Sequence, residues 1–230
     1  MEAPTKIAAA RLPKALRVDV WSDIACPWCY VGKKHLEQAL AQFPHRDEVE
    51  VTWRSFELDP AAPRTPKDPS ATYAEKLARK YRIPVVEAQG RIESMAAVGK
   101  TKGIDFQFDR ILSTNTFDAH RLVHLGGAQG KRQEMKERLL HAYFSEGAAL
   151  GDHEVLVRLG AEVGLDAAAV REMLATDTYA EEVRGDEAQA QEYGISGVPF
   201  FVLGRHGVSG AQPAEVLLKA LLTAWNEQAP

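Results

Sequence analysis

Val20-Trp21-Ser22-Asp23-Ile24-Ala25-Cys26-Pro27-Trp28-Cys29 is the stretch of sequence that decides the fold of this chain. Residues 17–21 alternate and are rich in β-formers, so they predict a strand. Pro27 suits the first turn of a helix, where its missing N–H has no partner to lose. Leu36, Leu40 and Phe43 follow at helical spacing, with Lys33 and Lys34 off that stripe. The sequence therefore predicts a strand, a turn and a helix over residues 27–43, with two cysteines at the helix start.

A second strand is predicted downstream of this helix. Residues 49–53 alternate between apolar and polar in the same way as the first strand. A strand, a helix and a second strand at this spacing form a βαβ unit, which we expect to be right-handed. Residues 59–69 contain four prolines and predict a linker that leaves the sheet.

The rest of the chain has two parts with different predicted secondary structure. From residue 70 to about 177 apolar residues recur at helical spacing, and no strand is predicted there. A helix over 178–193 then leads to short strands at 200–203 and 207–209 and a final helix. We therefore expect a flexible lead-in at residues 1–14, a sheet domain of residues 15–62 and 178–230, and an inserted helical subdomain of residues 63–177.

The composition of the chain limits the classes of molecule that it is expected to bind. The chain has 230 residues, a formal net charge of -4, 45% hydrophobic residues and 26% charged residues. This charge gives no reason to expect nucleic acid or an anionic membrane as partner. No run of about 18 apolar residues is present, so a membrane span is not expected. Residues 1–14 lack the apolar segment and cleavage site of a secretory signal.

The two cysteines of the chain are separated by only two residues. A ring this small constrains almost nothing in the unfolded chain, so a chemical role is favoured over a structural one. Cys26 is expected at the helix N-terminus, where the dipole and the free N–H groups stabilise a thiolate. Cys29 is expected one turn further in, more buried and protonated. We therefore predict Cys26 as the nucleophile and Cys29 as the resolving thiol.

The cysteine pair has two alternative interpretations. His120 and His124 have a spacing found in zinc sites, and a zinc site built with the two cysteines is one alternative. However, about ninety residues separate the cysteines from these histidines, which is far from the compact spacing of a zinc finger. Two buried thiols without a role are the other alternative, but a helix start is a poor place to bury them. We predict no metal.

Gly197-Val198-Pro199 is a second motif, placed directly before the strand at 200–203. This strand is expected beside the cysteine turn. We predict a cis bond between Val198 and Pro199 that leaves the Val198 backbone free to pair with an extended substrate. The alternative is a proline that only begins a strand.

Four segments together carry a family resemblance: residues 20–32, 56–58, 115–122 and 194–201. They resemble the DsbA-like thioredoxin superfamily, and more narrowly its FrnE-type branch. The resemblance implies an α/β thioredoxin fold with a large inserted α-helical subdomain. It also implies a cytoplasmic dithiol–disulfide oxidoreductase or isomerase that acts on protein or peptide thiols. No cofactor is implied beyond the redox-active disulfide, and the resemblance allows glutathione as co-substrate and glutathione or thioredoxin as reductant.

The chain also departs from parts of that superfamily. Some members carry an additional C-terminal cysteine pair, which is absent here, so a relay between two disulfides is excluded. Kappa-class glutathione transferases and 2-hydroxychromene-2-carboxylate isomerases are similar in architecture but typically use a serine where Cys26 stands. This contrast favours dithiol chemistry. The alternative function is a glutathione-dependent isomerase or transferase acting on a small aromatic molecule.

Further residues are candidates for substrate binding. Pro27, Trp28, Val198 and Pro199 surround the predicted thiol, and Trp28 and Tyr30 are candidates for an apolar lip. The resemblance places Asn115 and His120 on a helical segment that tends to face the active site, with His120 as a candidate proton shuttle. For Glu57, at the end of the second strand, a surface salt bridge is favoured over a buried proton acceptor. The sequence does not indicate an oligomeric state.

Overall fold

The computed structural model describes residues 15–66, 68 and 70–228. In this part of the chain a four-stranded mixed sheet has the order β2-β1-β3-β4. Its strands are β1 (Leu16–Ser22), β2 (Val49–Ser55), β3 (Phe200–Leu203) and β4 (His206–Ser209). β1 runs parallel to β2 and antiparallel to β3, and β4 is antiparallel to β3. The four predicted strands are therefore confirmed, and the predicted βαβ unit is their first half.

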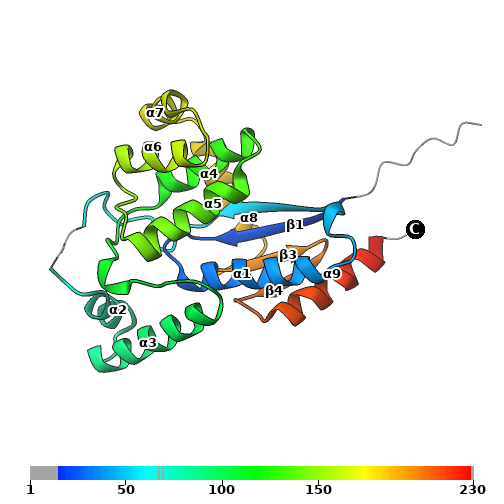
Figure 1. The fold of residues 1–230 in the computed structure, drawn as a ribbon, viewed down its shortest axis with the longest axis horizontal. Helices are drawn as coiled ribbons and strands as arrows, with labels where there is room; N and C mark the ends of the chain where they lie inside the picture. Colours follow the sequence, from blue (N-terminus) through cyan, green and yellow to red (C-terminus); the bar gives the residue numbers. More distant parts are fainter. Residues whose placement is uncertain (1–14, 67, 69, 229–230) are drawn as a thin grey trace, which may run out of the picture.

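Side chains alternate between the two faces of the sheet, as the period of a strand requires. Val20 and Phe201 belong to the main core, together with residues of α1 (Pro27–Gln42) and α9 (Ala214–Gln228). Trp21, their neighbour on β1, instead packs in a smaller cluster with Ala190 of α8 (Ala180–Glu192). Figure 1 shows α1 and α9 side by side along the sheet. Helices on both faces thus bury a sheet whose central strand, β1, leads directly to Cys26.

The segment between β2 and β3 is helical before α8, and no strand lies within its described residues. Its helices are α2 (Tyr73–Tyr81), α3 (Val85–Thr101), α4 (Phe117–Ala128), α5 (Arg132–His141), α6 (His153–Glu162) and α7 (Ala167–Ala175). Short helical turns are Arg46–Glu48, Phe108–Arg110 and the π-helical turn Ala142–Glu146. Figure 1 shows α2 and α3 as a pair apart from α4–α7. The predicted fold class, a thioredoxin fold with a helical insertion, is confirmed.

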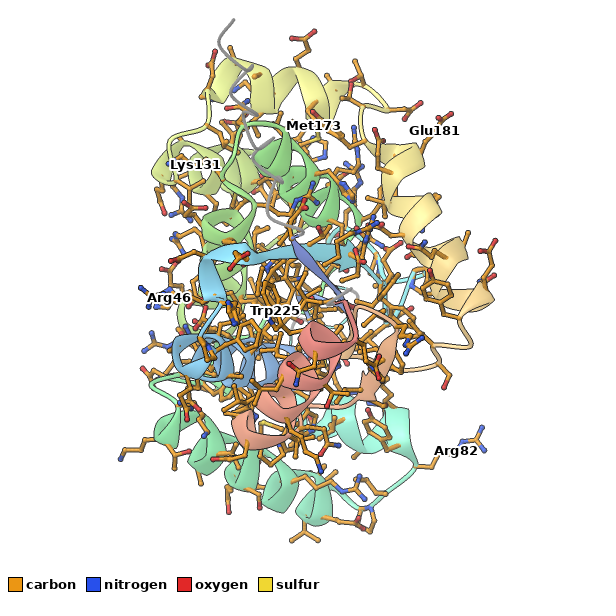
Figure 2. The ribbon with its side chains drawn as sticks, turned by 90° about the vertical axis from the view of Figure 1, so that its right-hand side faces the viewer. Arg46, Arg82, Lys131, Met173, Glu181 and Trp225 are labelled. Atoms are coloured by element: carbon orange, nitrogen blue, oxygen red, sulfur yellow. The ribbon has the colours of Figure 1, made fainter. Side chains whose placement is uncertain are left out.

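The α2–α3 pair projects from the body of the molecule. Thr72 caps α2 in a capping box with Glu75, and Arg82 ends it in the left-handed conformation with φ 54°. Figure 2 shows Arg82 pointing away from the ribbon. By contrast, Trp225 of α9 lies over the body of the molecule in the same view and stacks on His45 with ring centroids 4.2 Å apart. No helix in the described residues is long and apolar enough to cross a membrane.

The structure bears on the predicted lead-in segment and on the predicted exposure of Lys33. The lead-in predicted for residues 1–14 lies outside the described residues, and the predicted domain boundaries stay predictions. Lys33 lies off the predicted apolar stripe of its helix, and exposure to solvent is therefore expected, yet the residue is only 3% exposed. The reason is that α5 approaches this side of α1, so Lys33 forms ion pairs with Glu37 of its own helix and Glu137 of α5.

Candidate redox site

The first turn of α1 holds both cysteines. Cys26 is the N-cap residue, with extended backbone angles, and Pro27 occupies the first helical position. The Cys26 carbonyl accepts hydrogen bonds from the N–H groups of Cys29 at 3.0 Å and Tyr30 at 3.4 Å. No acidic residue lies in the first turn of α1, and the partial positive charge of the helix start acts at Cys26.

The two sulfur atoms lie in different surroundings. Both cysteines are free thiols in this structure. The Cys26 thiol lies 3.6 Å from the carbonyl oxygen of Val198, to which it donates, and Cys26 lines a cavity. Cys29 is 1% exposed and does not line that cavity. Burial, and next the neighbouring Cys26, raise the pKa of the Cys29 thiol well above its usual value.

A cavity of about 1290 Å³ opens next to Cys26. One wall comes from the cysteine turn and from Val198, and Trp28, which is 47% exposed, belongs to it. The opposite wall comes from α2, α3 and the segments next to them, and its apolar residues include Tyr73, Leu77, Met95, Val98 and Phe108. Lys76, Lys80 and Arg91 add positive charge to this lining, and Glu87 and Asp59 add negative charge. The sulfur of Cys26 is thus reached through a mainly apolar groove.

The loop before β3 packs closely on α1. The bond between Val198 and Pro199 is cis, as predicted. Val198 lines the cavity, whereas Pro199 is buried. A Cβ atom at Gly32 of α1 would lie 2.9 Å from Pro199 Cγ and 3.2 Å from Phe201 Cζ. The absence of a side chain at Gly32 therefore allows this loop to bring the Val198 carbonyl to Cys26.

Asp23 is a residue of the site that the sequence analysis treated only as part of a turn. Its carboxylate accepts hydrogen bonds from the Leu58 N–H at 2.8 Å, the Thr116 hydroxyl at 2.9 Å and the Ala25 N–H at 3.2 Å. His120 Nε2 lies 3.3 Å from the same carboxylate. Burial acts to raise the pKa of Asp23, but His120 and the other donors outweigh it and lower that pKa. Asp23 is therefore a buried, ionised group three residues before Cys26.

His120 and Asn115 do not reach the cavity wall. His120 is 1% exposed and held by Asp23. The Asn115 side chain donates to Glu57 Oε1 at 3.1 Å and accepts from the N–H of Phe117 at 2.9 Å, the first residue of α4. These contacts are those of residues that hold the site in place, and their assignment to substrate binding stays a prediction. Pro27, Trp28 and Val198 do line the cavity.

One expectation about neighbouring side chains is wrong, and another holds in part. Glu57 forms the expected salt bridge, with its carboxylate 2.6 Å from Arg184 Nη1, but that carboxylate is fully buried because α8 covers the end of β2. Tyr30 does not form a lip with Trp28. It is 3% exposed and packs against Phe144, since position 30 of α1 faces the core. Phe43 and Trp53 are core residues.

The two histidines of the zinc alternative are bound to different acids. His120 pairs with Asp23, and His124 Nε2 lies 3.1 Å from Asp186 of α8. Within the described residues no group of three or more His, Cys, Asp or Glu side chains is arranged to hold a metal ion.

Comparison with known proteins agrees with this geometry. A structure titled probable DsbA oxidoreductase SCO1869 from Streptomyces coelicolor is 45% identical, with a TM-score of 0.87 over 94% of this chain and 92% of its own. The uncharacterized protein YwbO of Bacillus subtilis is 31% identical over 90% of this chain and 96% of its own length. A 2-hydroxychromene-2-carboxylate isomerase shares the fold at 17% identity, with a TM-score of 0.68 over 93% of this chain and 98% of its own.

The family model described as DSBA-like thioredoxin domain matches residues 17–222, which include both cysteines, the helical insertion and all of the described strands except Leu16. With this match and relatives of 31% and 45% identity over most of their lengths, the chain belongs to the family of DSBA-like thioredoxin domain proteins.

Proposed function

We propose that this protein exchanges disulfides with protein or peptide thiols through Cys26 and Cys29. The observation that carries the proposal is the asymmetry of the pair: Cys26 faces a large groove, and Cys29 is buried directly behind it. A nucleophile must be reached by the substrate, whereas a resolving thiol needs to reach only the first sulfur. The fold of the family supports the same chemistry.

The reaction follows from these positions. In the reduced protein, the Cys26 thiolate attacks a substrate disulfide, forms a mixed disulfide and releases one substrate thiolate. Cys29 then attacks Cys26 Sγ, and the bond from Cys26 to the substrate breaks. The substrate gains two electrons and the protein gains the Cys26–Cys29 disulfide. The reverse sequence oxidises a substrate dithiol, so the direction depends on the redox state of the partners.

The groove supports a peptide as substrate. Its apolar lining suits side chains next to a cysteine, and the backbone of Val198 lies beside the reacting sulfur, where an extended chain can pair with it. Glutathione is a smaller occupant of the same groove, and we propose it or thioredoxin as the reductant. In keeping with the FrnE-type resemblance, we propose the cytoplasm as the compartment.

The second candidate is a glutathione-dependent isomerase or transferase acting on a small aromatic molecule, and one protein of the same fold is named a 2-hydroxychromene-2-carboxylate isomerase. The cysteine pair argues against it. Such an enzyme stabilises the thiolate of bound glutathione, but Cys26 would form a mixed disulfide with glutathione. Cys29 would then resolve that mixed disulfide.

Insulin reduction measured beside conjugation of glutathione to a model electrophile tests the proposal. We expect insulin reduction by the parent protein, and its loss in Cys26→Ser, with unchanged thermal unfolding as the control for folding. Conjugation that survives Cys26→Ser, together with no insulin reduction by the parent, would replace the proposal with the second candidate.

A further inference from the structure

Helix α2 presents one continuous face to the groove. The residues of α2 that line the groove follow one another at intervals of one, three or four, and they are Tyr73, Lys76, Leu77, Lys80 and Tyr81. Residues at this spacing share one face of a helix. The buried residues of α2, Ala74 and Ala78, lie off this face, and α2 packs against α3. The face of α2 toward the groove therefore combines apolar side chains with two ammonium groups.

Several other charged side chains of the groove already have partners within the protein. Asp23 is buried and accepts hydrogen bonds from backbone and side-chain donors. On α3, Arg91 Nη2 lies 2.7 Å from Glu87 Oε1, one helical turn away. These charges are compensated locally, so they leave little net attraction for the charge of an occupant.

The charges that remain lie on opposite walls of the groove. Lys76 and Lys80, on the α2 wall, form no ion pair with a carboxylate of the described residues. Asp59 also lines the groove and has no ion pair within the described chain. It belongs to the cysteine wall, because the N–H of the neighbouring Leu58 donates to Asp23. The groove is therefore polarised, with positive charge at α2 and negative charge near the cysteine turn.

The size and lining of the groove favour a polypeptide as its occupant. Its volume of about 1290 Å³ exceeds the roughly 300–1,000 Å³ of pockets that enclose a small molecule. On the cysteine wall, Trp28 and Leu58 are large apolar side chains that are exposed to solvent. Apolar contacts surrounded by polar groups are typical of protein interfaces. A chain segment that places apolar side chains between the walls and a carboxylate against α2 fits both features.

We propose that Lys76 and Lys80 select protein or peptide substrates that carry acidic side chains next to the reacting cysteine. This inference rests on the proposed function and narrows its substrate class. Complementary charges raise the rate of encounter and fix the position of a bound chain. Without such a site, acidic neighbours slow the attack of a thiolate on a disulfide, because like charges repel. A faster reaction with an acidic peptide therefore requires positive charge on the path of the substrate.

The first test compares two peptides that differ only in charge. Each has capped ends and a single cysteine in a mixed disulfide with 2-thiopyridine, flanked on both sides by either Glu or Gln residues. The Cys26 thiolate attacks the peptide sulfur, the bond to the thiopyridyl sulfur breaks, and the absorbance of the released pyridine-2-thione gives the rate. At low salt we expect the Glu peptide to react about fivefold faster, the effect of two exposed ion pairs. This preference should decrease as salt screens the charges.

Variants of α2 show whether the two lysines cause the preference. Lys76→Gln combined with Lys80→Gln should abolish it, and Lys76→Glu combined with Lys80→Glu should make the Glu peptide the slower substrate. Arg82→Gln is the matched control, because Arg82 directly follows α2, points away from the ribbon in Figure 2 and does not line the groove. We expect this control to keep the preference of the wild type, and thermal unfolding of each variant shows whether it is folded.

Three outcomes overturn the inference. The first is a wild-type protein without a preference for the Glu peptide, and the second is a preference that persists when both lysines are replaced by Gln. The third is an equal loss of preference in Arg82→Gln. Glutathione disulfide is a further substrate in the same assays. If the two peptides react equally while only glutathione disulfide is slowed by the lysine changes, the lysines serve glutathione and not a polypeptide.

A binding measurement separates this inference from the proposed function. Titration calorimetry with the same two peptides, in which Ser replaces the cysteine, requires no thiol exchange. We expect the wild-type protein to bind the Glu peptide about fivefold more tightly than the Gln peptide, and the variant with both lysines replaced by Gln to bind the two equally. Equal affinities in the wild type overturn the inference, whether or not the protein reduces insulin.

Discussion

Only two residues separate Cys26 from Cys29, yet the two cysteines belong to different regions of the molecule. Cys26 lies at the wall of the groove, next to the Val198 carbonyl and opposite the side chains of α2 and α3. Cys29 lies behind it in the interior and does not line the groove. The groove is lined by apolar side chains together with charged ones, of which Asp23 is one, whereas Cys29 lies in the buried interior.

This difference teaches that the two roles of the pair are set by separate parts of the chain. Access to Cys26 depends on the loop before β3 and on the α2–α3 pair. The charge around Cys29 depends on the turn after β1 and on α5. A change that affects access to Cys26 should therefore leave the charge around Cys29 intact, and the reverse should also hold.

The largest expected effect is on the covalent intermediate. Cys29→Ser should trap mixed disulfides with substrate, because nothing remains to release them, whereas Cys26→Ser should trap few. Iodoacetamide at neutral pH should label Cys26 before Cys29 in the reduced wild-type protein, as peptide mapping will show. Alkylation of Cys29 first would reverse the assignment and the comparison with it.

The next largest effect is expected for two buried Asp–His pairs whose histidines both lie on α4. Asp23 pairs with His120, and Asp186 pairs with His124. Each Asp→Asn change replaces a charged acceptor of several buried donors, so each should lower the free energy of unfolding by about 3 kcal/mol. Only Asp23→Asn should also alter the rate of thiol exchange, because Asp186 lies away from the cysteines on α8. Equal exchange rates in the two variants would show that the interior charges do not act on the pair.

The same two variants have a defined pH dependence. The hydrogen bonds to Asp23 and Asp186 lower both carboxyl pKa values despite burial. A lowered pKa contributes stability that is present above the unfolded value of about 3.9 and is lost as the pH falls through the folded value. The stability difference between wild type and either variant should therefore be full at pH 6 and shrink below about pH 4, as denaturant unfolding at several pH values will show.

The smallest expected effect lies on the groove side. Gly32→Ala places a Cβ atom against the rings of Pro199 and Phe201. Both neighbours are buried, and the Pro199 ring is closed on its own backbone, so we expect a loss of about 1–3 kcal/mol. Gly185→Ala in α8 is the matched control: nothing lies within 4 Å of its Cβ position, and the change should stabilise the helix. Urea unfolding of both variants measures this, and equal shifts would mean that the close packing at Gly32 is unimportant.

Much of this architecture is predictable because it follows from local patterns. Alternation at 17–21 and 49–53, Pro27 at a helix start and the Gly197-Val198-Pro199 motif gave the sheet, the helix and the position of the cysteines. These features depend on a few neighbouring residues, so a single sequence is enough to predict them. The cis bond and the greater burial of Cys29 follow from the same motifs.

The interior side of the site was not predictable in the same way. Glu57, Lys33 and Lys136 are polar residues buried by helices far from them in sequence, and a helical period does not show which helix covers which face. One signal was present for Lys136: it stands four residues before Leu140 and seven before Tyr143, at the start of an apolar stripe. A lysine at such a position is either buried or misassigned, and the structure shows that it is buried.

The position of β1 in the centre of the sheet has a consequence for protein synthesis. β1 pairs on one side with β2, which follows soon after it, and on the other with β3, from the far end of the chain. A ribosome releases Cys26 and Cys29 early, but the Val198 carbonyl emerges only after the whole helical insertion. Until then β1 has an unpaired edge and Cys26 lacks one wall of its groove. A growing chain therefore has its thiols before it has a redox site, and the site is complete only after β3 has been synthesised.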